Sequence, residues 1–292
     1  MPPSKSPLDE LRREIDQIDD SIHDLLMRRA KVVERIGAAK GDSRIFLRPG
    51  REAVILRRLV ARHTGAFPLP VLVRMWREMI SALTRLQGPF AVAVFAPEDR
   101  RGFWDVARDH FGSFVPMTAV NTPVAAVRAV SEGTATVGVV PIPAEDDTDP
   151  WWRYMVSSDS RTPRIVARLP FGGRGNARGE DRDAFAIALV PHEPTGDDRT
   201  LLGIELGYDL SRGRLKDTLE SAGLVPVGFC TWHSNREAGG PALHLVEIAD
   251  FVDHGDPRLA ALGERLGDVP VRINIMGGYA VPLNLPQDTR KI

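Results

Sequence analysis

The feature that most constrains the fold is a long amphipathic segment close to the start of the chain. Ser6 and Pro7 are typical of a helix start, and neither proline nor glycine follows before Gly37. A helix from Pro7 to Lys40 would extend about 50 Å, which is too long for a compact monomer of this size. Apolar residues three and four apart form a seam along one side, namely Leu8, Leu11, Ile15, Ile18, Ile22 and Leu25. We therefore expect another helix, for instance one from a second chain, to cover this seam.

Two further helices are predicted before residue 89. The first begins near Pro49 and is broken at Gly65. The second carries a helical pattern of apolar residues from Val71 to Leu86 and stops at Gly88. Residues 1–88 are therefore predicted to form an all-α domain of three helices.

After residue 88, short apolar runs alternate with helical stretches. From Phe90 to Ile142 the predicted order is β-α-β-α-β, which is typical of a parallel sheet with covering helices. From Thr200 to Met276 the predicted order is β-α-β-β-α-β, the ferredoxin-like pattern. The predicted fold is thus multidomain: a helical domain at 1–88, an α/β domain at 89–195 and a βαββαβ domain at 196–292.

Composition excludes several classes of function. The formal net charge is −1, whereas a nucleic-acid-binding protein usually has a strongly basic face. Cys230 is the single cysteine, so no intrachain disulfide can form and a reducing compartment is favoured. We find neither an apolar signal core nor an apolar run approaching the ~20 residues of a membrane helix. The seven histidines do not show metal-ligand spacing with Cys230. We therefore expect a cytoplasmic protein without nucleic-acid or membrane partners, metal or cofactor.

A set of cations, one carboxylate and one amide lies on the three predicted helices: Arg12, Arg29, Lys40, Arg51, Glu52 and Gln87. Such a set could hold a small dianion, and it contains neither a nucleophile nor a metal cluster. Arg29 and Lys40 are three helical turns apart, with their backbones separated by about 16 Å, and they project from nearly the same side. Arg12 lies about 25 Å from Arg29 along the same helix. It can reach the same small ligand only if it comes from a second chain.

The spacing of these residues and their neighbours resembles that of the all-helical chorismate mutases. The motifs that carry the resemblance are Leu11-Arg12, Ile15, Ile18-Asp19, Leu25-Leu26-Met27-Arg28-Arg29, Ile36-Gly37-Ala38-Ala39-Lys40, Arg51-Glu52 and Gln87. The resemblance covers roughly residues 7–88 and implies an intertwined homodimer, in which the long first helix crosses from one active site to the other. It also implies the concerted rearrangement of chorismate to prephenate in phenylalanine and tyrosine biosynthesis by the shikimate pathway, without a cofactor.

The same resemblance implies the catalytic roles. Arg29 would bind one substrate carboxylate, and Arg12 of the partner subunit would bind the other. Lys40 and Gln87 would donate to the ether oxygen, where negative charge builds as the bond breaks. Arg29, Lys40 and Gln87 would thus be the catalytic residues.

The remaining substrate-binding roles fall on the second predicted helix. By the resemblance, Glu52 would accept a hydrogen bond from the ring hydroxyl, and Arg51 would position either that carboxylate or the substrate. Two positions depart from the family pattern. Arg48 stands where an aspartate is frequent, and Leu83 stands where a serine is frequent.

The rest of the chain resembles the parts that follow this mutase in bifunctional chorismate mutase–prephenate dehydratases. The matching dehydratase segments are Ala96-Pro97-Glu98, Val139-Val140-Pro141-Ile142 and Thr162-Pro163-Arg164. Only about twenty residues join Ile142 to Thr162, whereas one βαβ unit alone takes ~30, so the second lobe of a dehydratase cannot fit. The segment from Thr200 to about Val281 resembles an amino-acid-binding ACT domain. The Glu-Ser-Arg-Pro ligand motif of those domains is replaced here by Thr231-Trp232-His233-Ser234.

The sequence leaves three functions open. The favoured one is a chorismate mutase whose dehydratase-derived half has lost its own chemistry. In that case the C-terminal half would serve stability, dimer contacts or docking to another shikimate-pathway enzyme. The alternatives are a bifunctional chorismate mutase/prephenate dehydratase and a non-catalytic regulator that binds aromatic amino acids.

Overall fold

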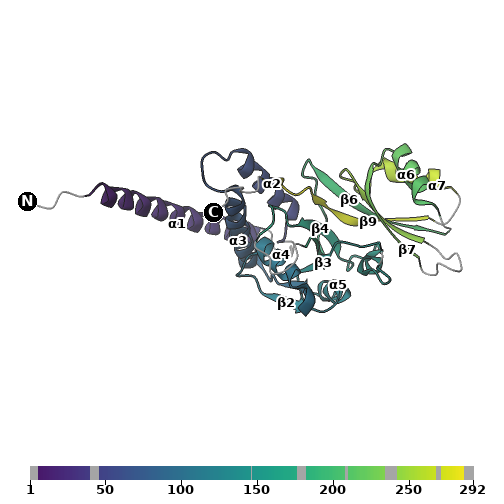
Figure 1. The fold of residues 1–292 in the computed structure, drawn as a ribbon, viewed down its shortest axis with the longest axis horizontal. Coiled ribbons are helices and arrows are strands. Elements are labelled where there is room, and N and C mark those ends of the chain that lie inside the picture. Colours follow the sequence, from purple (N-terminus) through teal and green to yellow (C-terminus); the bar gives the residue numbers. More distant parts are fainter. Residues whose placement is uncertain are drawn as a thin grey trace, which may run out of the picture.

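The computed structural model of the chain describes residues 6–39, 46–145, 147–175, 182–207, 210–233, 242–267 and 271–285. A helical N-terminal part is followed by a large mixed sheet (Figure 1). The helices are α1 (Pro7–Ala39), α2 (Pro49–Ala61), α3 (Leu69–Gln87), η1 (Glu98–Arg100), α4 (Gly102–Phe111), α5 (Pro123–Ser131), η2 (Trp151–Met155), α6 (Arg212–Ser221) and α7 (Pro257–Leu266). The strands are β1 (Val92–Phe95), β2 (Met117–Val120), β3 (Val137–Pro141), β4 (Arg164–Leu169), β5 (Ala184–Ala188), β6 (Asp198–Leu206), β7 (Pro226–His233), β8 (Ala242–Ile248) and β9 (Val271–Ala280).

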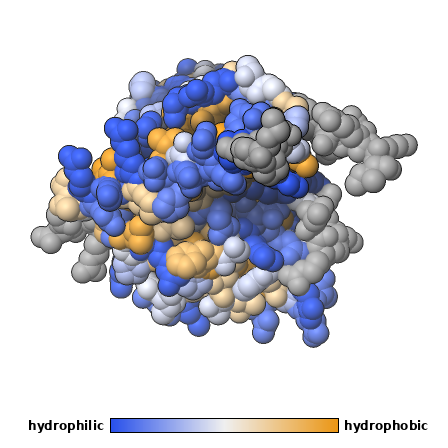
Figure 2. All heavy atoms as spheres, turned by 90° about the vertical axis from the view of Figure 1, so that its left-hand side faces the viewer, coloured by the Kyte–Doolittle hydropathy of each residue, from blue (hydrophilic) through white to orange (hydrophobic). Residues whose placement is uncertain are grey.

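Helix α1 extends away from the rest of the molecule (Figure 1). It begins at Pro7 as predicted, and none of its residues is buried. The apolar seam is open to solvent in the single chain, with exposed fractions from 47% at Ile22 to 62% at Leu25. Figure 2 views the molecule from this end and shows hydrophobic patches among hydrophilic side chains. None of the described helices is long and apolar enough to cross a membrane.

Helices α2 and α3 pack against the sheet rather than projecting from it. A small core joins them to the ends of β4 and β9, and it contains Ala53, Leu56, Val73, Phe171 and Ala280. The three predicted helices are thus present, but two of them bury their apolar faces within the chain.

Hydrogen bonds from Arg57 connect α2 to the loop between β5 and β6 and to the end of β9. Its Nη1 donates to the backbone oxygen and to Oγ1 of Thr195, at 3.3 and 2.7 Å. Its Nη2 donates to the backbone oxygens of Asp197 and Val281, at 2.7 and 3.0 Å. The predicted boundary at residue 88 therefore separates segments that share a polar and apolar interface.

The sheet has the strand order β2-β1-β3-β5-β4-β9-β6-β8-β7. Strand β1 pairs in parallel with β2 and β3, which confirms the parallel arrangement expected from the β-α-β-α-β pattern. Strand β5 is antiparallel to both β3 and β4. Helix α4 packs on one face of these strands, and α5 packs with η2 on the other.

The C-terminal strands and helices follow the predicted β-α-β-β-α-β order, from β6 to β9. Their strands lie in the order β9-β6-β8-β7, all antiparallel, and α6 and α7 cover one face (Figure 1). Strand β9 also pairs with β4, at Ile165 and Gly277. A glycine is required there because its φ is +117° and a Cβ would collide with the backbone of Ile165. The strands of the two predicted C-terminal domains therefore form one continuous sheet, and the division at residue 195 stays a prediction.

Candidate functional site

The site expected in the helical part centres on the contact between α1 and α3. The two helices meet near the C-terminal end of α1, where Gly37 lies against the side chain of Gln87. Gln87 is partly buried, and its Nε2 donates a long hydrogen bond of 3.5 Å to the backbone oxygen of Leu83. Lys40 lies outside the described residues, three positions after Gly37. Gln87 therefore faces the turn of α1 that leads to Lys40.

Arg29 is partly buried on α1. Its guanidinium is half-buried, and burial lowers the pKa of Arg29 from its ordinary value. The Nη1 atom is buried, and it has no hydrogen-bond partner among the described residues. A buried donor without an acceptor lowers the stability of the folded chain. A carboxylate placed beside Arg29 would accept a hydrogen bond from Nη1 and remove that cost.

Arg12 and Arg51 are not brought to Arg29 within one chain. Arg12 is exposed near the far end of α1, where it forms an ion pair of 3.5 Å with Asp9. Arg51 is exposed on the first turn of α2. The isolated chain therefore assembles only part of the predicted set.

Glu52 has a partner that the sequence reasoning missed. Arg77 of α3 donates from Nη1 to Oε2 of Glu52 at 2.7 Å, and the two side chains are only 6% and 13% exposed. The guanidinium of Arg77 also lies over the ring of Phe171, 4.9 Å from the ring centre. A signal for this position did exist, because Arg77 lies four residues after Val73 and three before Ile80, on the buried face of α3.

Burial dominates the electrostatics around this pair. It raises the pKa of Glu52, and the charge and hydrogen bond of Arg77 oppose that rise. The neighbouring His110 is buried as well, and burial together with the charge of Arg77 holds its pKa well below the usual range. His110 is therefore neutral, and Arg77 and Glu52 form the charged pair at this point.

Of the segments that resemble a dehydratase, one borders a different cavity, through Pro141 and Ile142. It has a volume of about 430 Å³ and lies at the carboxyl ends of β1 and β3, with Arg100 and Trp151 in its wall. Arg164, in another of these segments, donates from Nη1 to the backbone oxygen of Ile275 at 2.9 Å. Between β3 and β4 the described residues form the short helix η2, which matches the expectation that no second lobe fits there.

No group of three or more histidine, cysteine, aspartate or glutamate side chains suited to a metal ion occurs within the described part of the chain. Cys230 is buried, and burial raises the pKa of its thiol to about 11. The thiol is therefore protonated near neutral pH and is a poor nucleophile.

Residues 11–88 match the family described as chorismate mutase type II. The chain is 32% identical over 146 residues to a bifunctional chorismate mutase/prephenate dehydratase of Pseudomonas aeruginosa, across 46% of this chain and 38% of the relative. An enzyme of the same description from Aquifex aeolicus is 35% identical over 144 residues, with the same coverage of both chains. The chain thus spans well under half the length of the curated relatives it matches.

Among solved structures, the prephenate dehydratase of Streptococcus mutans aligns with 66% of this chain and 99% of its own, at 13% identity and a TM-score of 0.45. The family match lies within the helical part, on the same residues that carry Arg12, Arg29, Glu52 and Gln87. Residues 11–88 are thus similar to the chorismate mutase type II family, and a large mixed sheet follows them.

Proposed function

We propose that this protein rearranges chorismate to prephenate, and that it does so as a homodimer. The observation that carries the proposal is the state of α1 in the single chain. Its apolar seam is open, and Nη1 of Arg29, on the same helix, is a buried donor without an acceptor among the described residues. A second copy would cover the seam, and a carboxylate of the substrate would accept from this Nη1.

In this dimer each site takes residues from both chains. Arg29 and Arg12 of the partner subunit each bind one carboxylate of chorismate. Lys40 and Gln87 donate to the ether oxygen and stabilise the charge that develops there as the bond breaks. The rearrangement is concerted, so the residues hold the reactive conformer and need not form a covalent intermediate.

Glu52 and Arg51 complete the proposed site. Arg77 bonds to Oε2 of Glu52, and we assign Oε1 to the hydroxyl of the substrate. The charge and hydrogen bond of Arg77 oppose the rise that burial causes in the pKa of Glu52, and so favour its carboxylate form as an acceptor. Arg51, one position earlier on α2, orients the carboxylate or the substrate.

We place this dimer in the cytoplasm, because a chain with a single buried cysteine is suited to a reducing compartment. The C-terminal sheet contributes to stability through its contacts with α2 and α3. Its ACT-like β-α-β-β-α-β part, from β6 to β9, is available for dimer contacts or for docking to another enzyme of the shikimate pathway.

The test is chorismate consumption by the purified full-length chain. We expect Arg29→Ala, Lys40→Ala and Gln87→Ala each to lower turnover ~10²–10³-fold, because each removes a group that stabilises the transition state. Arg58→Ala, an exposed arginine on α2, is the matched control and should retain wild-type turnover. Wild-type protein without turnover, or an Arg29→Ala variant as active as the control, would overturn the proposal.

The two alternatives are measured with the same protein. We expect no conversion of prephenate to phenylpyruvate, because η2 replaces the second lobe that would close a dehydratase site. Formation of phenylpyruvate above background would instead indicate that the protein is a bifunctional chorismate mutase/prephenate dehydratase. Calorimetric binding of phenylalanine, tyrosine or tryptophan without chorismate turnover would instead assign the regulator.

A further inference from the structure

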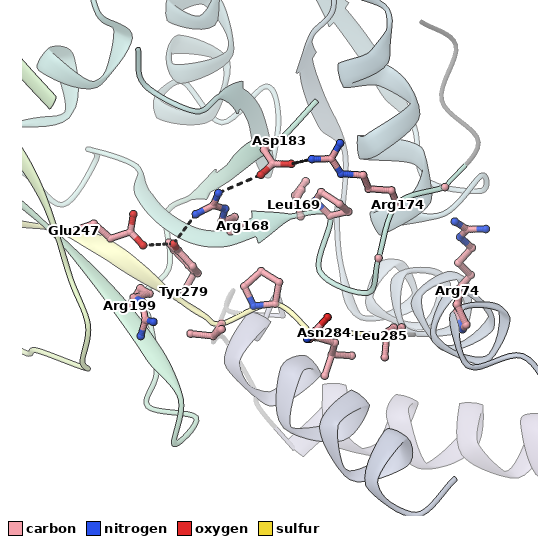
Figure 3. A pocket seen from close by; sticks show the side chains of 17 residues that line it. Arg74, Arg168, Leu169, Arg174, Asp183, Arg199, Glu247, Tyr279, Asn284 and Leu285 are labelled. Carbon is pink, nitrogen blue, oxygen red and sulfur yellow. Dashed lines mark hydrogen bonds and ion pairs between the residues drawn. The ribbon is translucent and has the colours of Figure 1, made fainter. Parts of the chain in front are cut away.

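A second site lies away from the mutase residues, at the junction of the helical part and the sheet. It is a cavity of about 750 Å³ between α3, the end of β4 and the segment that follows β9 (Figure 3). Cavities of 300–1,000 Å³ are typical of small-molecule sites. Its wall includes none of Arg12, Arg29, Arg51, Glu52 or Gln87, and it is separate from the cavity beside β1 and β3.

The lining of this junction cavity is positively charged. Its side chains include the guanidinium groups of Arg74, Arg168, Arg174 and Arg199, against the carboxylates of Asp183 and Glu247. The described lining thus has a formal excess of two positive charges. An anion is the kind of ligand that such an excess favours.

Both carboxylates are already engaged. Asp183 accepts from Arg168 at 3.1 Å and from Arg174 at 3.2 Å (Figure 3). Glu247 accepts from the hydroxyl of Tyr279, which in turn accepts from Arg168 at 3.4 Å. Asp183 and Glu247 are thus already engaged by Arg168, Arg174 and Tyr279. They do not neutralise the other two arginines of the wall, Arg74 and Arg199.

Arg199 is the arginine with donors to spare. It lies on β6, and its Nη1 donates to the backbone oxygen of Asp198 at 3.1 Å. Within the described residues it has no carboxylate at ion-pair distance. Arg74 lies at the other end of the lining in Figure 3, and its Nη2 is a long 3.7 Å from Asp109. A planar guanidinium with free donors is well suited to a carboxylate.

The part of the wall between these arginines is apolar. It contains Leu169, Pro170, Pro282, Leu283 and Leu285. We propose that the junction cavity binds a small organic carboxylate with an apolar body. The carboxylate lies on Arg199, and the apolar body packs on the leucine and proline side chains. This binding site is additional to the proposed mutase activity and does not depend on it.

The experiment is isothermal titration calorimetry of the full-length chain with phenylpyruvate, which carries one carboxylate on an aromatic body. We expect Arg199→Ala to weaken binding ~10-fold or more, because a hydrogen bond to a charged group is lost. Arg199→Lys keeps the charge but not the fork, and it should bind between the wild type and the alanine variant. Arg272→Ala, an exposed arginine on β9 outside the cavity, is the matched control.

Two comparisons make the result specific. Arg29→Ala should lower chorismate turnover ~10²–10³-fold yet bind phenylpyruvate as the wild type does, so failure of the mutase proposal and failure of this one are distinguishable. Inorganic phosphate should bind much more weakly than phenylpyruvate, because it lacks an apolar body. The proposal is overturned by absence of binding, by equal affinity of Arg199→Ala and wild type, by loss of binding in Arg29→Ala, or by phosphate binding as tightly as phenylpyruvate.

Discussion

Helix α1 and the pair α2–α3 belong to the same predicted domain, yet they bury their apolar faces in different ways. The seam of α1 has no buried residue in the single chain. The apolar faces of α2 and α3 are covered by the ends of β4 and β9, in the core that contains Leu56 and Phe171. Part of the predicted helical domain thus buries its apolar face within one chain, whereas the apolar seam of α1 is exposed in the single chain.

The charged residues follow the same division. Arg77, on α3, donates to a carboxylate within the chain, with 2.7 Å between its Nη1 and Oε2 of Glu52. Arg29, on α1, has a buried Nη1 without a partner among the described residues. The comparison teaches that the sheet organises one side of the proposed site, whereas in our proposal a second copy and a ligand complete the other side.

The largest effect should come from placing a charge on the seam of α1. Ile18→Glu puts a carboxylate where the second copy must pack, and burying an unpaired charge is strongly unfavourable. We expect a monomer by sedimentation velocity, with chorismate turnover reduced ~100-fold or more because half of each site is absent. Gln17→Glu adds the same charge off the seam and should remain dimeric. A dimeric, active Ile18→Glu variant would show that the seam is not the interface.

The second effect concerns the buried pair between α2 and α3. Arg77→Met leaves the carboxylate of Glu52 buried without its partner, and we expect a loss of about 3–5 kcal/mol in the free energy of unfolding. Urea denaturation measures it. The double variant Arg77→Met with Glu52→Leu removes both charges and should recover much of that loss. A single variant as stable as the wild type would mean that the pair is unimportant to the contact between α2 and α3.

The smallest effect is a pH dependence of the free energy of unfolding that arises from His192, in the loop between β5 and β6 that contacts α2. Burial lowers the pKa of His192 to about 4, whereas an unfolded histidine titrates near 6.5. The depressed folded pKa means that the contribution of His192 is present above pH 6.5 and is lost as the pH falls toward 4. The loss amounts to about 3 kcal/mol at most. Unfolding measured between pH 7 and 4 should show a shallower decline in His192→Gln, and an unchanged slope would contradict this assignment.

Local sequence signals predicted most of the elements. Ser6 and Pro7 marked the start of α1, which begins at Pro7 in the structure. The β-α-β-β-α-β order from β6 to β9 was also predicted, because the switch between strand and helix periodicity is local. Strand ends differed by a few residues; β9, for example, continues past Met276 to Ala280.

Long-range pairings were beyond local signals. The contact of β4 with β9 joins Ile165 to Gly277 across more than one hundred residues, so neither strand reveals it alone. The bond between Arg77 and Glu52 likewise depends on how α2 and α3 pack. Of the candidate site, the sequence indicated Arg29 and Gln87 by their spacing, but the pairing of Glu52 required coordinates.

The sequence by itself determined the long amphipathic helix, the order of the strands along the chain and the family motifs of residues 11–88. These follow from side-chain periodicity and spacing, which act over a few residues. Only the tertiary structure decided that α2 and α3 rest on the sheet, that Glu52 is held by Arg77, and that arginines from α3, β4 and β6 surround one cavity. Each of these depends on packing between segments far apart in the chain, where burial and charge act together.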